Sequence, residues 1–404
     1  MSRLVVLVFA LLALTPAAPV SSAGAQQPPQ IDARAWLLLD ADDGAELAAS
    51  APDLELPIAS ATKLMTAYVA LEELELDQLV SASAYQGLPA EVVLALRAGE
   101  QISVGDLLAA MLIASANDAA VALAVETSGS IEAFVARMNR EARRLGLEDT
   151  QFSNPIGLDA PDNHSSARDL ASLTLKLRRN KHFREIVSSR EARLETGSAP
   201  RDIVTRNDLL AERPWVDGVK TGRTIGAGYV LVGSGSREGV NLVSVVLGAP
   251  SEAARDAESL ELLKYGFSLY ELRTAVARGR VLAEPELKFS DESLSLVAAE
   301  AVELTLRADQ VLDSEVVAPE EVEGPIERRE PLGEAIVTVD GKPAGTAALV
   351  AARAVAAPST LDKLGIWLPA LLIAAGALLI VVAFAGARRR RSQSQSPEEQ
   401  ATTA

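Results

Sequence analysis

The feature that most limits how this chain can fold is an uncharged apolar segment near its C-terminus, residues 364–387. At about 1.5 Å per residue, a helix over this segment is about 36 Å long, enough to cross a bilayer with some tilt. Four arginines follow at once, and arginines beside a span mark its cytoplasmic side. We therefore expect one transmembrane helix over 364–387 and a cytoplasmic tail over 388–404.

The N-terminus fits the same orientation. Residues 1–25 have the pattern of a secretory signal peptide, in which Arg3 precedes an apolar run and a small-x-small site ends at Ala25. The apolar run is too short to cross the hydrocarbon core, which favours cleavage over an uncleaved anchor. A polar linker follows over 26–32. The folded part of the chain is therefore expected outside the cytoplasm, on the cell membrane.

Composition excludes several kinds of site. The 404 residues carry a formal net charge of −17, which argues against nucleic acid as a partner because phosphate neutralisation needs Lys and Arg. The chain has no cysteine, so a cysteine nucleophile, a thiolate metal site and a disulfide are excluded. Asp40, Asp42 and Asp43 lack the spacing of cation ligands and indicate a turn. We expect no metal and no organic cofactor.

Two regions with different patterns lie between the linker and the apolar segment. The first, 33–272, combines helical periodicity over 62–74, 104–125, 131–145, 167–177 and 253–269 with β-rich runs over 229–232 and 242–247. This pattern predicts an α/β (α+β) domain with an antiparallel sheet flanked by helices. The second, 275–357, has short β-rich runs and an Asp-Gly turn, which predict a small β-rich domain. Residues 344–359 are Ala-rich and are interpreted as a tether to the span.

The first chemical motif is Ser60-Ala61-Thr62-Lys63, at the start of a predicted helix. A spacing of three places Ser60 and Lys63 on one helical face. A serine hydroxyl needs a neighbouring base, and a lysine can serve where burial or a nearby cation lowers its pKa. By itself the motif is weak, and it is more typical of a capping serine beside a solvated lysine than of a catalytic pair.

Two further motifs follow along the chain. Ser115-Ala116-Asn117 interrupts an apolar helical stretch, where Ser and Asn compete with helix hydrogen bonds. Lys220-Thr221-Gly222 places a cation on a predicted edge strand, beside a glycine that lets a ligand's backbone come close. Alone, the first is compatible with a helix break and the second with a β-turn carrying an exposed lysine.

Together, in this order and at these separations, the three motifs resemble the penicillin-recognising serine hydrolases. More closely, the chain resembles the low-molecular-mass D-alanyl-D-alanine carboxypeptidases over about residues 33–267. Further matching segments are Leu64-Met65-Thr66-Ala67-Tyr68, Asn117-Asp118-Ala119-Ala120, Phe152-Ser153-Asn154-Pro155-Ile156-Gly157-Leu158 and Ala167-Arg168-Asp169-Leu170-Ala171.

This resemblance implies roles for the motif residues. Ser60 would be the acylated nucleophile and Lys63 its general base, while Ser115 would relay a proton. Asn117 would position Lys63 and the substrate amide. The resemblance also implies a β-lactamase/transpeptidase-like fold, peptidoglycan stem peptides as substrate and β-lactam antibiotics as inhibitors.

The resemblance assigns the third motif to the substrate. Lys220 would hold Ser115 and lower nearby lysine pKa values by like charge. The N–H groups of Ser60 and Arg223 would form an oxyanion hole, and Gly222 would let the substrate's backbone come close. Thr221 and Arg223 would bind the substrate's terminal carboxylate.

The chain departs from the family pattern at three places. Ala116 replaces a common Gly, Arg223 replaces a common His, and Ile225-Gly226 replaces a common acidic pair. We expect these changes to affect substrate preference and rate. A β-lactamase, a peptidoglycan DD-endopeptidase and a non-catalytic wall-binding protein remain alternatives to the carboxypeptidase. We find no Glu-x-x-Leu-Asn segment of the kind that activates the deacylating water in β-lactamases.

Overall fold

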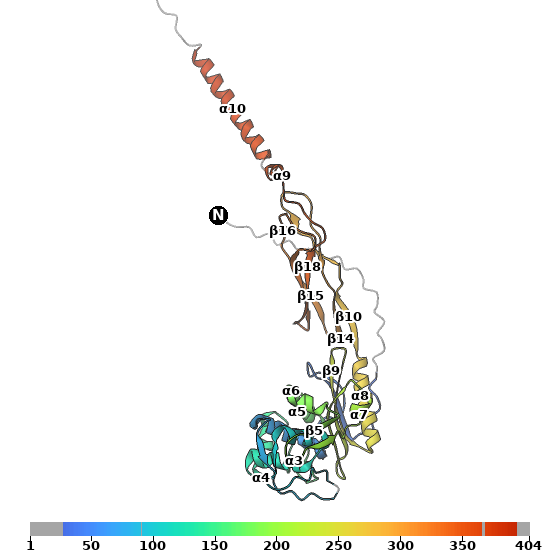
Figure 1. The fold of residues 1–404 in the computed structure, drawn as a ribbon. Helices are drawn as coiled ribbons and strands as arrows, with labels where there is room; N and C mark the ends of the chain where they lie inside the picture. The colour runs from blue at the N-terminus through green and yellow to red at the C-terminus, as the bar shows by residue number, and fades with distance from the viewer. Residues whose placement is uncertain (1–26, 90, 366–367, 394–404) are drawn as a thin grey trace, which may run out of the picture. The chain divides into compact units, whose positions relative to one another are not determined.

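The computed structural model describes residues 27–89, 91–365 and 368–393 (Figure 1). These residues form two compact units that divide between Leu269 and Tyr270. Each unit has its own cluster of buried hydrophobic side chains. The predicted signal peptide lies outside the described residues, as does the end of the predicted cytoplasmic tail from residue 394.

The first unit is built on a five-stranded antiparallel sheet in the order β2-β1-β9-β8-β7. Its strands are β1 (Ala35–Asp40), β2 (Glu46–Ser50), β7 (Val216–Thr224), β8 (Gly228–Arg237) and β9 (Val240–Ala249). Leu37 and Leu39 of β1 join the main hydrophobic core. Leu38, which points to the opposite face, lies beside Gly266 of α8 (Glu252–Ser268). Helices therefore cover both faces of the sheet, as the predicted fold class requires.

The main core is formed largely by helices that precede the last three strands in sequence. They are α1 (Lys63–Glu73), α2 (Val104–Ala109), α3 (Asn117–Ser128), α4 (Ile131–Arg144) and α5 (Ala167–Leu177). Serine side chains at positions 130, 166 and 251 accept hydrogen bonds from the first-turn N–H groups of α4, α5 and α8. Such caps explain why the predicted bounds of these three helices are accurate to within one residue.

Smaller elements complete the first unit. They are a 3₁₀ turn, η1 (Ala59–Thr62), a π-helical turn, η2 (Ala110–Ala114), the strand pairs β3 (Leu79–Ser81) with β4 (Gln101–Ser103) and β5 (Glu191–Leu194) with β6 (Arg201–Val204), and the helices α6 (Lys181–Val187) and α7 (Leu209–Glu212). These strand pairs cannot be predicted from the sequence pattern, because two strands of three or four residues give too short a periodic signal.

The second unit is β-rich. It contains a five-stranded sheet in the order β11-β13-β18-β17-β15 and the pairs β10-β14 and β12-β16. The strands are β10 (Tyr270–Val276), β11 (Val281–Ala283), β12 (Glu286–Leu287), β13 (Leu296–Ala298), β14 (Val302–Arg307), β15 (Leu312–Val317), β16 (Glu321–Val322), β17 (Pro331–Val339) and β18 (Lys342–Ala351).

The prediction that residues 344–359 form a tether is wrong for the first half of the segment, residues 344–351. Residues up to Ala351 belong to β18, which lies at the centre of the sheet between β13 and β17. Its alternate residues Ala347, Leu349 and Ala351 are buried. Alanine has a low strand propensity, so the residue types of this segment do not predict a strand, and its place in the sheet comes from packing.

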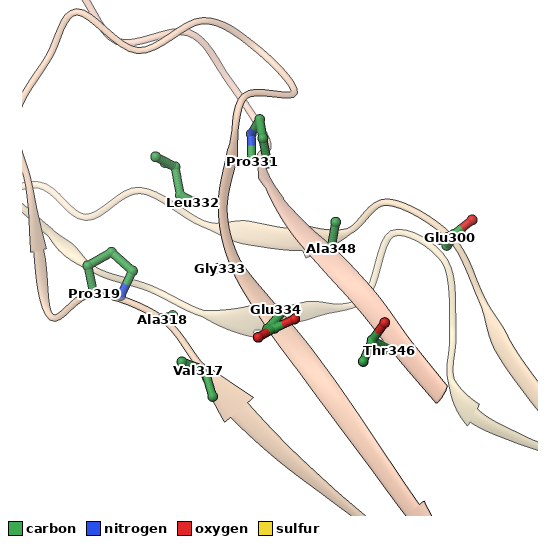
Figure 2. A pocket seen from close by; sticks show the side chains of 10 residues that line it. All are labelled: Glu300, Val317, Ala318, Pro319, Pro331, Leu332, Gly333, Glu334, Thr346 and Ala348. Atoms are coloured by element: carbon green, nitrogen blue, oxygen red, sulfur yellow. The ribbon is translucent and has the colours of Figure 1, made fainter. Parts of the chain in front are cut away.

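A hollow of about 580 Å³ lies on the second unit, where β15 ends and β17 begins (Figure 2). Its ionisable side chains are the carboxylates of Glu300 and Glu334, and Thr346 supplies a hydroxyl. No basic side chain lines it to activate that hydroxyl. The chemistry expected from the motifs therefore belongs to the first unit.

The chain continues into α9 (Thr360–Gly365) and α10 (Leu368–Gln393). Within the described residues, no single helix is both long and apolar enough to cross a membrane. The helix pair α3 and α4, bent by 83°, passes that test as a pair, and Leu372–Arg388 is a shorter apolar helix. The transmembrane helix predicted over 364–387 includes two residues outside the described part and stays a prediction.

A glycine in the loop before α5 contacts the turn that carries Ser60. Gly157 has φ +90°, and a Cβ built there would lie 1.9 Å from the carbonyl oxygen of Ala59. The Asn154 side chain holds this loop by accepting hydrogen bonds from three successive backbone N–H groups, at residues 156–158. The loop and the serine turn can therefore touch only because residue 157 lacks a side chain.

We predict that Gly157→Ala lowers the free energy of unfolding of the first unit by about 3 kcal/mol or more, because the methyl group meets backbone atoms that cannot move aside. Gly129→Ala is the matched control. Gly129 also has a positive φ, +79°, but no atom lies within 4 Å of its built Cβ, so this change should cost only about 1 kcal/mol. Urea unfolding of both variants measures the difference, and equal costs would contradict the close contact.

Candidate active site

The turn η1 places Ser60 directly before α1, and Lys63 is the first residue of that helix. Ser60 is half-buried, whereas Lys63 is fully buried. The Lys63 Nζ lies 2.9 Å from the Ser60 Oγ. The sequence motif therefore folds into a hydroxyl and an amine in direct contact, with the hydroxyl on the more accessible side.

Four oxygen atoms surround the Lys63 amine. Besides Ser60, they are Asn117 Oδ1 at 2.6 Å, the carbonyl oxygen of Ile156 at 3.1 Å and Ser115 Oγ at 3.5 Å. The Asn117 and Ile156 oxygens can only accept hydrogen bonds. They therefore accept hydrogen bonds from two N–H groups of the lysine. When the lysine is neutral, its nitrogen keeps one free electron pair, which can accept a hydrogen bond from the Ser60 hydroxyl.

Ser115 reaches this amine because the helix before it is broken. The π-helical turn η2 ends at Ser115, whose φ of +66° is left-handed, and Ala116 is extended. The Ala116 N–H donates to the carbonyl of Ala110, which closes the widened turn. Asn117 then starts α3 as a new helix. The predicted interruption of this apolar stretch is confirmed, and both polar residues face Lys63.

The third motif reaches the same place from β7. The fully buried Lys220 Nζ lies 3.0 Å from Ser115 Oγ and donates to the carbonyl of Thr221. Ser115 thus lies between two lysines. A Cβ built at Gly222 would lie 2.9 Å from the backbone N of Ser60, so the strand passes directly along the serine turn.

The other two residues of the predicted substrate site lie further along β7. The Thr221 side chain is buried, and Arg223 is exposed. The Arg223 guanidinium stacks over the Tyr229 ring, 5.3 Å from its centroid. Asp159 fixes the strand's end, because its carboxylate accepts from the Thr224 hydroxyl at 2.6 Å and from the Gly226 N–H at 2.9 Å.

Burial controls the charge state of both lysines. Loss of solvent lowers the pKa of Lys63 to about 7, against the opposing charges of Glu91 and Asp118. The pKa of Lys220 is also lowered, first by burial and then by the charges of Lys63 and Arg206, with Arg255 adding to them. Burial is thus the first cause of the lowered pKa of both lysines, and the like charge of Lys63 is the second cause for Lys220.

Two carboxylates to which the sequence assigned no role, those of Glu91 and Asp118, support this cluster. The Glu91 Oε2 accepts from Asn117 Nδ2 at 2.7 Å. The Asp118 carboxylate accepts from the backbone N–H groups of Leu94 and Leu96. Glu91 lies in a segment without periodicity, 26 residues before its partner. Of the two, only Asp118 could have been noticed in the sequence, because it lies inside an apolar helical stretch and a buried charge requires partners.

This arrangement can carry out acyl transfer. It combines an accessible hydroxyl, a buried amine able to take its proton near neutral pH, and a second hydroxyl bridging to another amine. In the described part of the chain, no group of three or more His, Asp and Glu side chains could hold a metal ion.

Comparison with known proteins identifies the first unit. The family model for D-alanyl-D-alanine carboxypeptidase matches residues 22–251. The family model for the C-terminal domain of penicillin-binding protein 5 matches residues 270–357. D-alanyl-D-alanine carboxypeptidase DacC of Escherichia coli is 35% identical over 80% of this chain and 85% of its own. DacF of Bacillus subtilis is 30% identical over 83% of this chain and 87% of its own.

Solved structures agree with the sequence relatives. Penicillin-binding protein 5 of Haemophilus influenzae superposes with a TM-score of 0.59 at 31% identity, covering 82% of this chain and all of that one. The Streptomyces K15 DD-transpeptidase superposes with a TM-score of 0.58 at 30% identity, over 60% of this chain and all of that one. The chain therefore belongs to the D-alanyl-D-alanine carboxypeptidase family, as a serine peptidase that acts on peptidoglycan.

Proposed function

We propose that this chain removes the terminal D-alanine from peptidoglycan stem peptides through an acyl-enzyme on Ser60. The observation that carries the proposal is the 2.9 Å contact between Ser60 Oγ and a buried Lys63 whose pKa is about 7. The family supplies the reaction, and this contact supplies a way to perform it. In the first step Ser60 Oγ bonds to the carbonyl carbon of the penultimate D-alanine while its proton moves to Lys63 Nζ.

Ser115 and Lys220 serve the leaving group. When the tetrahedral intermediate collapses, the peptide bond breaks and the departing D-alanine amine must gain a proton. Ser115 Oγ is 3.0 Å from Lys220 Nζ and 3.5 Å from Lys63 Nζ, so it can pass a proton from this pair to the amine. Water then attacks the ester carbonyl, releases the shortened stem and restores the Ser60 hydroxyl.

The remaining motif residues hold the substrate. We assign the oxyanion hole to the N–H groups of Ser60 and Arg223, because the missing side chain at Gly222 lets β7 approach the serine turn closely. Asn117 holds Lys63 through Oδ1, and the family role adds contact with the substrate amide. Thr221 and Arg223 bind the terminal carboxylate, which favours carboxypeptidase over endopeptidase action. The proposed reaction needs no metal or cofactor.

We further propose that the enzyme works outside the cytoplasm, held to the membrane by residues 364–387 after removal of the signal peptide 1–25. The large apolar side chains of α10 that lie between Leu372 and Phe384 are at least 60% exposed, so they have no protein core to bury them. Lipid hydrocarbon is the natural environment for such a helix surface. The family's substrate, peptidoglycan, lies on that outer side.

Ser60→Ala should abolish both the covalent adduct with benzylpenicillin and the release of D-alanine from a D-Ala-D-Ala peptide, the latter by at least about 10⁴-fold. Ser172→Ala, an exposed hydroxyl on α5, is the control and should behave as wild type. Intact-protein mass spectrometry and D-alanine assay measure the two effects. An adduct that persists in Ser60→Ala contradicts the assignment, and rapid turnover of benzylpenicillin by wild type favours a β-lactamase.

Acylation should depend on pH through Lys63. Only the neutral amine accepts the Ser60 proton, and with a pKa of about 7 it is neutral above and charged below that pH. The second-order rate constant for acylation should therefore fall about tenfold per unit as pH drops below 7, and level off above it. Stopped-flow measurement with a chromogenic β-lactam tests this, with circular dichroism confirming the fold at each pH. A midpoint near 10 would show a solvated, charged lysine.

The full chain should remain with the membrane fraction through high-salt washing and require detergent for release. A chain ending at Ser359 lacks α9 and α10 and should be recovered in the soluble fraction with its penicillin binding intact. Cell fractionation with a fluorescent penicillin measures both. Release of the full chain by salt alone would mean that 364–387 does not span the bilayer.

A further inference from the structure

Behind Asn117 lies a carboxylate for which the catalytic motifs give no role. Glu91 is half-buried in the segment that joins β3 to β4. Its Oε2 accepts from Asn117 Nδ2 at 2.7 Å and from the Tyr85 hydroxyl, and its Oε1 accepts from the Leu88 N–H at 3.0 Å. A side chain held by three donors has a single defined position.

That position dictates the orientation of the Asn117 amide. The amide has an accepting oxygen at one end and a donating NH₂ group at the other. Since Glu91 can only accept, it takes the NH₂ end and directs Oδ1 toward Lys63, where it lies 2.6 Å from Nζ. With the amide reversed, an NH₂ group would face the lysine N–H groups and an oxygen would face the carboxylate, so both contacts would become repulsive.

The segment carrying Glu91 is itself fixed to the start of α3. The Asn117 backbone N–H donates to the carbonyl of Val92 at 2.8 Å. The neighbouring Asp118 accepts from the N–H groups of Leu94 and Leu96, at 2.9 and 3.0 Å. Glu91 and Asn117 thus belong to one hydrogen-bonded assembly, although they are 26 residues apart in sequence.

Glu91 also bears a charge close to the reacting amine. Burial acts to raise the pKa of Glu91, but hydrogen bonds from Tyr85, Leu88 and Asn117 outweigh it and leave the pKa below its usual value. The carboxylate is therefore ionised at neutral pH. Three titratable groups face Lys63: the carboxylates of Glu91 and Asp118, which raise its pKa, and the amine of Lys220 beyond Ser115.

We propose that Glu91 is a positioning residue for acylation, which locks the Asn117 amide so that Lys63 directs its free electron pair at the Ser60 hydroxyl. Asn117 Oδ1 and the Ile156 carbonyl then occupy two N–H groups of the neutral amine. Without Glu91, the amide would be free to reverse and to offer the lysine a donor in place of an acceptor. The inference rests on the proposed function, since it assigns a task to Asn117 and Lys63 in acylating Ser60.

Two substitutions separate orientation from charge. Glu91→Ala removes the acceptor, so the acylation rate constant on its high-pH plateau should fall about tenfold or more. Glu91→Gln keeps an oxygen that can accept from Asn117 Nδ2, so its plateau should recover to within about threefold of wild type. Both variants remove a negative charge that raises the pKa of Lys63, so this pKa should fall. The pH at which the acylation rate constant reaches half of its plateau should therefore also fall.

The control is Glu126→Gln, which removes one charge from the exposed far end of the same helix, α3. This change should alter neither the acylation rate constant at high pH nor the pH at which that rate constant begins to fall. Stopped-flow acylation by a chromogenic β-lactam and hydrolysis of the acyl-enzyme are measured on the full chain in detergent, with thermal melting to verify folding. A Glu91→Ala protein that folds and acylates with the wild-type plateau overturns the inference, because the Asn117 amide would then keep its orientation without Glu91.

Slowed hydrolysis with unchanged acylation in Glu91→Gln would also overturn it, because Glu91 would then act on the deacylating water. A plateau in Glu91→Gln as low as in Glu91→Ala would show that an accepting oxygen is not what Asn117 requires. These outcomes differ from failure of the proposed function, in which the wild-type protein itself would form no adduct on Ser60.

Discussion

The active site depends on the burial of one amine. Lys63 has no solvent contact, and a charged ammonium in such a place costs several kcal/mol unless it is paired. The protein surrounds it with neutral oxygens from Asn117, Ile156 and Ser60, while the two nearest carboxylates, of Glu91 and Asp118, act at longer range. This balance leaves the amine close to half neutral at pH 7. A closer carboxylate would hold it protonated, and a wetter site would do the same.

The same amine joins parts of the chain that are distant in sequence. Ser60 and Lys63 come from the start of α1, Asn117 from α3 and Ile156 from the loop before α5. Ser115 extends the contacts to Lys220 on β7. Each of these hydrogen bonds satisfies a buried polar group that would otherwise be costly, so the site's geometry and the packing of the first unit are stabilised together.

Close approach of backbone segments is the second requirement. The serine turn lies between Gly157 on one loop and Gly222 on β7, and a Cβ built at either glycine would fall within 3 Å of that turn. Ala59, just before Ser60, has a φ of +47°, which an L-residue adopts at some cost. The serine thus lies on a strained turn between two segments that approach it closely at glycines, and its side chain stays half-buried rather than enclosed.

The sequence by itself determined the class of the first domain, the helices with serine caps and the residue types of the three motifs, because periodicity, capping and spacing are local properties. It also indicated that the apolar stretch 104–125 breaks at Ser115. Only the tertiary structure decided that Lys63 and Lys220 share one hydroxyl, that the Ile156 carbonyl and the Glu91 carboxylate support the amine, and that the Ala-rich segment after Lys342 forms a central strand. The physical reason is that burial and hydrogen-bond partners arise from packing between segments far apart along the chain, and these contacts set the charge of a lysine and the direction of an amide.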